Sequence, residues 1–255
     1  MIVKKVKSLI RKSLNKIGFY RKWQLKKNTL NFEFIYLLLF AQKNKNIKIV
    51  QIGANHGMDL LNKFNNDNRN KISYIGIEPQ EVPFNQLKQT YKGFKNFNLI
   101  KECVGKKGKN NFFYLNKNYE EYCKKNNIDF LYNGYGGNSL IKENISKRLI
   151  NNNLNPDTYI SNYEIEVNPL YDVLKKHNLD CEHYKNIDLL QIDTEGYDDE
   201  TIYNSNLEFF KPKYINFEYH NLSKNKLENL IKFLNEKSYE CIKYKPNDCL
   251  AVLRE

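Results

Sequence analysis

The sequence lacks the patterns that mark a disulfide-bonded, zinc-binding or membrane-spanning protein. Its five cysteines are an odd number and include no C-x-x-C pair, which argues against both a disulfide framework and a zinc knuckle. Reduced thiols in the cytoplasm are therefore expected. The apolar run at 34–41 is far too short to cross a bilayer. The basic N-terminus also lacks the apolar core and the cleavage site of a signal peptide.

No arginine-rich cluster with interleaved aromatic residues occurs either, which argues against sequence-specific recognition of nucleic acid. The charge is nonetheless one-sided, since 41 Lys and Arg against 29 Asp and Glu give a formal net charge of +12. Two interpretations stay open. The abundance of lysine and asparagine is typical of AT-rich coding, and a basic surface also favours an anionic partner such as nucleic acid, a membrane surface or an acidic glycan.

A chain of 255 residues suits one α/β domain with some decoration, and we expect that domain at 46–255 behind a helical extension at 1–45. Within residues 1–27, Lys and Arg mix with apolar residues at roughly helical spacing, which indicates a basic amphipathic helix ending near Gly18. Such a helix can cap the domain, form a partly ordered tail or lie on the inner face of an anionic membrane. Residues 31–41 predict a buried helix.

Apolar segments alternate with helical patterns along the rest of the chain, which predicts a doubly wound, mostly parallel α/β sheet. Strands are predicted at 47–52, 73–78, 97–101, 111–115, 187–192 and 214–218, and helices at 58–64, 84–91, 198–206 and 223–236. Segments 239–244 and 249–253 predict a C-terminal antiparallel hairpin. Residues 116–165 show little regularity, and we expect an irregular lid or substrate insertion there, over the carboxyl edge of the sheet.

The chain is organised around residues 47–57, where an apolar strand breaks into the turn Gly53-Ala54-Asn55-His56-Gly57. Gly53 permits a tight turn, and Gly57 permits close packing or the approach of a ligand to the backbone. The helix expected next offers unpaired N–H groups. The spacing is G-x-N-x-G and not the dinucleotide fingerprint G-x-G-x-x-G. A nucleotide-type ligand and a purely structural turn fit this stretch equally well.

Acidic residues follow three later strands of the predicted sheet, at the edge where open α/β sheets bind ligands. Glu78 ends the second strand, where an ionised carboxylate can accept both hydroxyls of a ribose. Asp193 and Glu195 follow the strand at 187–192 and can bind a hard divalent metal, act as a general base or cap the next helix. Glu218 and His220 close the strand at 214–218, and a histidine beside a carboxylate is either a poised base or a solvated side chain. Residues 198–200 are interpreted as complementing the helix dipole.

Taken in order, these motifs resemble the FkbM family of S-adenosyl-L-methionine-dependent methyltransferases, a branch of the Rossmann-like class I methyltransferases. The resemblance covers roughly residues 47–220. Its glycine motif is similar to residues 50–57, with Gln51 where the family usually has Asp, and its acidic motif is similar to Gly76-Ile77-Glu78-Pro79. The signature Lys-Ile-Asp-x-Glu-Gly is matched at 191–196, with Gln191 in place of Lys. Asn138-Ser139-Leu140 is similar to the family's Ser-rich segment.

The resemblance implies a seven-stranded sheet and an enzyme that methylates a hydroxyl, with a sugar of a surface polysaccharide or glycolipid as the acceptor. It implies cofactor contacts from Gln51, Gly53, Asn55, Gly57, Glu78 and Pro79. It implies catalytic roles for Asp193, Glu195, Glu218 and His220, and a divalent metal such as Mg²⁺ on Asp193 and Glu218, as in catechol-type methyltransferases. A nicotinamide-dependent oxidoreductase and a non-catalytic binding module of the same fold are the alternatives. Nothing indicates the oligomeric state.

Overall fold

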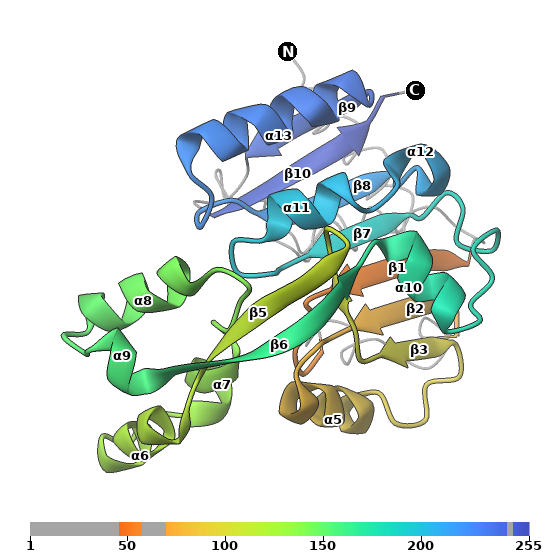
Figure 1. The fold of residues 1–255 in the computed structure, drawn as a ribbon. Helices are drawn as coiled ribbons and strands as arrows, with labels where there is room; N and C mark the ends of the chain where they lie inside the picture. The colour runs from red at the N-terminus through yellow and green to blue at the C-terminus, as the bar shows by residue number, and fades with distance from the viewer. Residues whose placement is uncertain (1–45, 58–69, 244–246, 255) are drawn as a thin grey trace, which may run out of the picture.

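The computed structural model describes residues 46–57, 70–243 and 247–254 (Figure 1). The helices predicted at 1–27, 31–41 and 58–64 lie outside the described residues, and so does the membrane contact considered for the first of them. None of the helices in the described ranges is long and apolar enough to cross a membrane.

A seven-stranded sheet forms the centre of the molecule, in the order β3-β2-β1-β7-β8-β10-β9. Five of its strands pair in parallel: β1 (Ile47–Ile52), β2 (Ile72–Ile77), β3 (Phe97–Ile100), β7 (Leu189–Ile192) and β8 (Tyr214–Glu218). β10 (Asp248–Leu253) runs antiparallel to β8 and to β9 (Tyr239–Lys243). The predicted parallel sheet and its C-terminal hairpin are confirmed. The order places the carboxyl ends of β1, β2, β7 and β8 side by side.

Helices pack on the sheet because its strands are apolar on both faces. α10 (Leu170–Lys176), α11 (Asp198–Tyr203), α12 (Leu207–Phe210) and α13 (Lys224–Glu236) pack with the face that carries Val50 and Ile52. α5 (Glu81–Thr90) contributes Leu87 to a second cluster around Ile49, on the opposite face. The helices predicted at 84–91, 198–206 and 223–236 therefore form, with ends that differ by a few residues.

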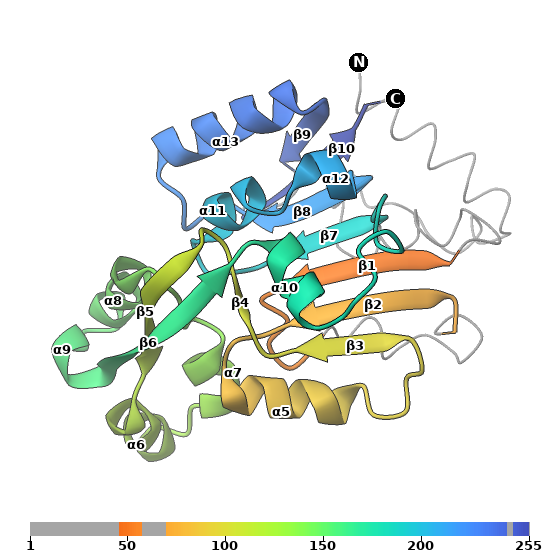
Figure 2. The same cartoon turned by 45° about the vertical axis from the view of Figure 1, so that its right-hand side comes forward.

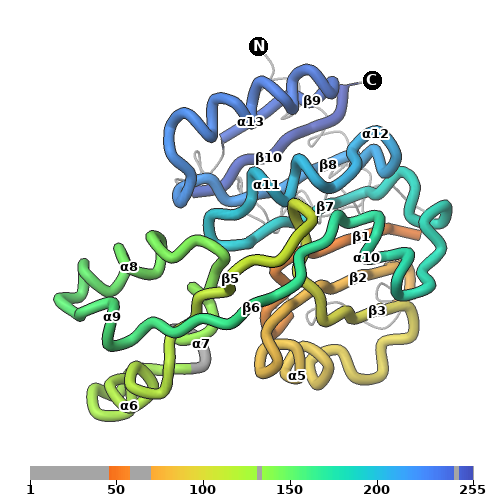
Figure 3. The backbone as a smooth tube through the Cα atoms, in the orientation of Figure 1, coloured from red at the N-terminus to blue at the C-terminus, as the bar shows by residue number. Residues whose placement is uncertain are grey.

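A second, three-stranded sheet lies at the carboxyl edge of the main sheet and extends away from it (Figure 2). It contains β4 (Cys103–Val104), β5 (Gly108–Leu115) and β6 (Ile160–Asn168) in the order β4-β6-β5. The chain runs out along β5, forms α6 (Lys117–Lys125), α7 (Phe130–Tyr135), α8 (Lys142–Asn151) and α9 (Pro156–Tyr159), and returns along β6 into α10 (Figure 3). Residues 108–168 are called the arm below. The strand predicted at 111–115 forms, but in this second sheet.

The irregularity expected at 116–165 is wrong, because helices and a strand make up most of that segment. The expected role of the segment as a lid or substrate insertion stays a prediction. The arm helices surround a small apolar cluster of their own, which includes Leu115, Tyr119, Cys123, Ile145 and Leu149. In α6 and in α8 the buried apolar residues are a single pair four residues apart, Tyr119 and Cys123 in the first and Ile145 and Leu149 in the second. One such pair among lysines and asparagines gives too weak a periodicity to predict a helix.

Candidate active site

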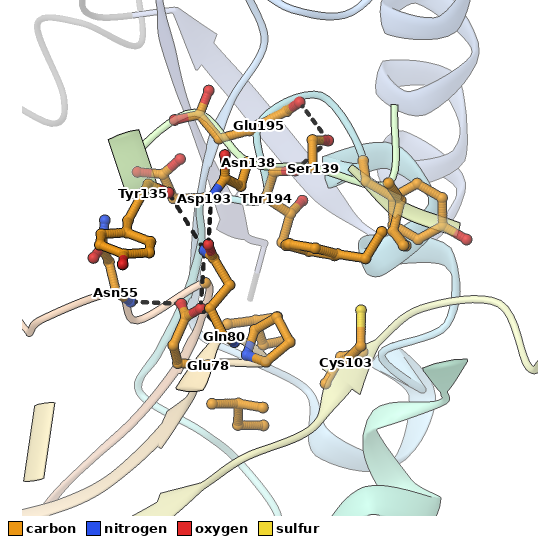
Figure 4. A pocket seen from close by; sticks show the side chains of 18 of the residues that line it. Asn55, Glu78, Gln80, Cys103, Tyr135, Asn138, Ser139, Asp193, Thr194 and Glu195 are labelled. Carbon is orange, nitrogen blue, oxygen red and sulfur yellow. Dashed lines mark hydrogen bonds between the residues drawn. The ribbon is translucent and has the colours of Figure 1, made fainter. Parts of the chain in front are cut away.

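A cavity with about 620 Å³ of free space, part of it open to solvent, lies at the carboxyl edge of the main sheet (Figure 4). The main sheet supplies its floor, and β5 and the segment after α7 supply the rest of its wall. Six of the sequence-predicted residues line it: Gly53, Asn55, Glu78, Pro79, Asp193 and Glu195.

The other four predicted residues do not line this cavity. The Gln51 Oε1 accepts a hydrogen bond of 2.6 Å from the Tyr74 hydroxyl on the face of the second apolar cluster. Gly57 packs on α5, since a Cβ there would lie 3.1 Å from the Thr90 and Tyr91 side chains. Glu218 lies near the Asp193 carboxylate and His220 lies beside Glu218, and both are described with that cluster below.

Position 53 requires glycine because the loop after β1 crosses the loop after β7 there. Its φ of +75° is a conformation that glycine adopts without strain, and a Cβ at this position would overlap the carbonyl oxygen of Asp193. The two loops are tied by a 3.0 Å bond from the Asp193 N–H to the Ile52 carbonyl. Asn55 has a φ of 47°, which asparagine tolerates better than most residues. The turn is therefore shaped to pass over β7 and present its backbone to the cavity.

Glu78 is a buried carboxylate held by three hydrogen bonds. The Asn55 N–H donates to its Oε2 at 2.8 Å, while the Gln80 N–H and the Gln80 side chain donate to its Oε1 at 2.9 and 3.2 Å. These bonds use three of about four lone-pair positions and leave acceptor capacity on Oε2. Burial raises the pKa of Glu78 to about 7, and the hydrogen bonds oppose that rise. A hydroxyl donor on Oε2 would favour the ionised form.

Three carboxyl groups meet at the other end of the cavity. Asp193, Glu195 and Glu218 each bring an oxygen within 4.8 Å of the others. Burial is the main cause that raises the pKa of each, to about 6 for Asp193, about 8 for Glu195 and about 9 for Glu218, and neighbouring carboxylates add to it. The Asp193 side chain is exposed on the side of the cavity, and protein atoms surround it on its other sides. At pH 7 the cluster therefore carries protons, and Asp193 is the member most ionised.

His220 lies behind this cluster, with Nδ1 3.0 Å from the Glu218 Oε1. Burial lowers the pKa of His220, so the ring is neutral at pH 7 and can receive a proton. Because Glu218 ends β8 and Asp193 follows β7, the adjacency of these two strands brings the pair together. The structure thus brings Glu218 near Asp193 and His220 near Glu218, and the catalytic roles expected of these residues stay predictions.

Asp198 has a larger role than the expected complement to a helix dipole. It is fully buried, and its Oδ2 accepts bonds from the N–H groups of Thr194 and Gly196 and from the Thr194 hydroxyl. Its Oδ1 accepts the Glu218 N–H at 3.2 Å. This one side chain ties the loop after β7 to the end of β8. Sequence reasoning missed it because nothing in the sequence separates it from the other acids at 198–200.

The arm also contributes residues that the sequence did not indicate as a site. The Ser139 hydroxyl and the Asn144 side chain both donate to the Glu195 carbonyl at 2.9 Å. Glu195 has a φ of 54°, uncommon for a residue other than glycine, and these two donors hold its peptide in place. Tyr135 and Asn138 complete the wall above Glu78. The similarity of Asn138-Ser139-Leu140 to a family segment was the one available signal.

Comparison with known proteins identifies the family. Residues 51–241 match the model of the methyltransferase FkbM domain, which is well over half of the chain. A search of curated proteins returned no match. Among solved structures, a chain of the crystal structure of a fibrillarin/Nop5p complex is similar at 12% identity and a TM-score of 0.40, over 82% of this chain and 73% of that one. That likeness is too distant to carry an argument.

Proposed function

Because the chain belongs to the FkbM methyltransferase family, and so is an S-adenosylmethionine-dependent methyltransferase, we propose that its acceptor is a sugar hydroxyl of a surface polysaccharide or glycolipid. One observation carries the chemistry. Glu78 and the cluster of Asp193 and Glu195 line the same cavity, with the Gly53–Asn55 turn beside both. Such a site can hold a nucleoside at one end and handle a proton at the other.

Glu78, Gly53, Asn55 and Pro79 form the proposed cofactor end. When bound, S-adenosylmethionine supplies an activated methyl group on a sulfonium. The free acceptor capacity on the Glu78 Oε2 suits a ribose hydroxyl. Gln51 bonds to Tyr74 on the sheet face away from the cavity, and Gly57 packs on α5. We therefore propose that these two residues shape the turn and do not contact the cofactor directly.

Asp193 is the proposed proton acceptor. Methyl transfer to a hydroxyl forms an O–C bond as the S–C bond breaks, and the hydroxyl proton must leave. Asp193 lines the cavity and has the lowest pKa of the cluster, about 6, so it is largely ionised at neutral pH. The pair of Glu218 and His220 behind it can relay that proton outward. His220→Ala is therefore expected to slow turnover without changing cofactor affinity, and wild-type turnover would remove His220 from the relay.

A divalent cation such as Mg²⁺ is the further component that we propose, on Asp193 and Glu218 with Glu195 as a third ligand. Its support is the 4.8 Å grouping of three carboxylates, which is the oxygen donor set that Mg²⁺ takes. EDTA is expected to abolish turnover and Mg²⁺ to restore it. Unchanged activity in EDTA would rule out an essential metal and leave proton transfer as the role of the three carboxyl groups.

Binding of S-adenosylhomocysteine tests the cofactor site without any knowledge of the acceptor. The full chain is expected to bind it in isothermal titration calorimetry, and Glu78→Gln is expected to weaken that binding by about tenfold or more, since a charge-assisted acceptor is lost. Binding of NAD in its place would favour the oxidoreductase alternative. Binding of neither would favour the non-catalytic module.

The acceptor class needs a separate test. The protein and a methyl-labelled donor are incubated with glycan and glycolipid fractions, and base-stable label on a sugar is the expected result, because a methyl ether survives base and a methyl ester does not. Label only in protein or nucleic acid would contradict the proposal. Membrane contact through residues 1–27 belongs to the same proposal, and deletion of residues 1–18 is expected to abolish sedimentation with anionic vesicles.

A further inference from the structure

A chain of amide hydrogen bonds links the arm to Glu78 (Figure 4). The backbone N–H of Leu115, at the end of β5, donates to the Asn138 Oδ1 at 3.1 Å. The Asn138 Nδ2 donates to the Gln80 Oε1 at 2.5 Å, and the Gln80 Nε2 donates to the Glu78 Oε1 at 3.2 Å. The Gln80 Nε2 also donates to the Tyr135 carbonyl at 3.3 Å. Two residues far apart in sequence thus connect the roof of the cavity to its buried carboxylate.

The direction of this chain is fixed by its two ends. A backbone N–H can only donate, and an ionised carboxylate can only accept. Each amide between them must therefore present its oxygen toward Leu115 and its nitrogen toward Glu78. Leu115, Asn138 and Glu78 are each less than 10% exposed, and Gln80 is partly buried, so water screens the aligned amides only in part, and hydrogen bonds in such a chain strengthen one another.

We propose that Gln80 and Asn138 are positioning residues of the cofactor site, which hold the Glu78 carboxylate ionised and keep its Oε2 available to the ligand. The proposal rests on the role of Glu78 toward the cofactor ribose. Gln80 occupies Oε1 with two donors, so the remaining capacity of the carboxylate lies on Oε2. The arm, expected from the sequence to select the acceptor, thereby also takes part in binding the cofactor.

The pH dependence of ligand binding reports on this arrangement. Burial raises the Glu78 pKa, and the Gln80 donors lower it. Among the described residues facing Glu78, Asp193 also raises its pKa, while Cys103 on β4 and Tyr163 on β6, each with a pKa of about 12, stay neutral below pH 9. Loss of the side-chain donor raises the Glu78 pKa further. Affinity then falls near neutral pH and returns in alkaline buffer.

Asn138→Asp is the sharpest variant because it keeps the shape of the side chain. An aspartate can still accept the Leu115 N–H but cannot donate to Gln80, so its carboxylate repels the Gln80 Oε1 and draws the Gln80 Nε2 away from Glu78 and the Tyr135 carbonyl. Asn138→Ala removes the link without adding charge. Asn116→Ala is the matched control, since it removes an arm asparagine that caps α6 and bonds Thr158 and Ser161 outside the cavity.

The measurement is the dissociation constant of S-adenosylhomocysteine by calorimetry between pH 6 and 9, for full-length proteins whose folding is checked by circular dichroism. Both Asn138 variants are expected to bind about fivefold more weakly at pH 7, which corresponds to a rise of about one unit in the Glu78 pKa from its value of about 7, and to recover at pH 9. Asn116→Ala is expected to match the wild type. Wild-type affinity in both Asn138 variants at pH 7, equal loss at every pH, or the same loss in Asn116→Ala would overturn the proposal. If the wild type does not bind the ligand at all, the proposed cofactor site fails first.

Discussion

Gly53 holds the most constrained position in the site, because the first loop crosses the end of β7 there. Gly53→Ala is expected to shift the loop off Asp193 and to abolish binding of S-adenosylhomocysteine in calorimetry, since a Cβ would overlap a backbone oxygen that cannot rotate away. The unfavourable φ alone accounts for only about 1–2 kcal/mol. Gly93→Ala separates the two effects, because Gly93 has a φ of +90° and open space around it. It is expected to lower the melting temperature slightly and to leave affinity unchanged. Equal loss of binding in both would show that strain, and not the overlap, is responsible.

At the same scale, the sequence indicated some site residues and missed others for a physical reason. Glu78 and Asp193 follow strands that are apolar enough to recognise in the sequence. Because those strands were predicted to be parallel, both residues were predicted to lie at the carboxyl edge of the sheet. Gln80 and Asn138 act through a contact across 58 positions of chain, which no local pattern records. The side chain of Gln51 points to the sheet face away from the cavity, because successive strand residues point to opposite faces and the next residue, Ile52, lines the cavity.

The arm has an apolar cluster that is separate from the two clusters of the main sheet. We therefore expect the arm to unfold largely independently of the main sheet. Leu149→Ala, at a position 1% exposed on α8, is expected to destabilise the arm by about 2–5 kcal/mol. Hydrogen exchange is expected to accelerate in α6 and α8 while β1 and β7 stay protected. The neighbouring Ile150 is 58% exposed, so Ile150→Ala provides the control and should change little. Faster exchange throughout the main sheet would contradict a separate arm.

The main sheet was predictable and the arm was not, because their sources of stability differ. Strands such as β1 and β2 are buried along nearly their whole length and read as continuous apolar runs. The arm relies on few apolar residues, on asparagine caps such as Asn116 and Asn155, and on pairing of β5 with β6 across the helices between them. Asparagine is so abundant in this chain that its presence at a helix start carries little information.

At the scale of the whole molecule, the active site concentrates negative groups in a chain of net charge +12. The pKa is raised by burial for five carboxyls: to about 7 for Glu78 and Asp198, about 6 for Asp193, about 8 for Glu195 and about 9 for Glu218. The folded protein therefore holds more protons than the unfolded chain from about pH 4 to 9. Stability contributed by these groups is present at low pH and is lost as the pH rises through each folded-state value. The lowered pKa values of His220 and Cys241 act in the opposite direction.

The melting temperature of the ligand-free protein, measured at constant ionic strength, is consequently expected to fall from pH 6 to pH 9. Glu218→Gln should flatten the alkaline part of that profile, because the amide is neutral at every pH. Glu208→Gln is the control: Glu208 is exposed, pairs with Lys237, and has a lowered pKa, so it does not titrate in this window. Mg²⁺ added with the wild type should also flatten the profile if it binds the cluster, since a cation replaces the protons. A melting temperature that rises from pH 6 to 9 would mean that the five carboxyls are ionised in the folded protein, and that the cluster does not hold protons at neutral pH.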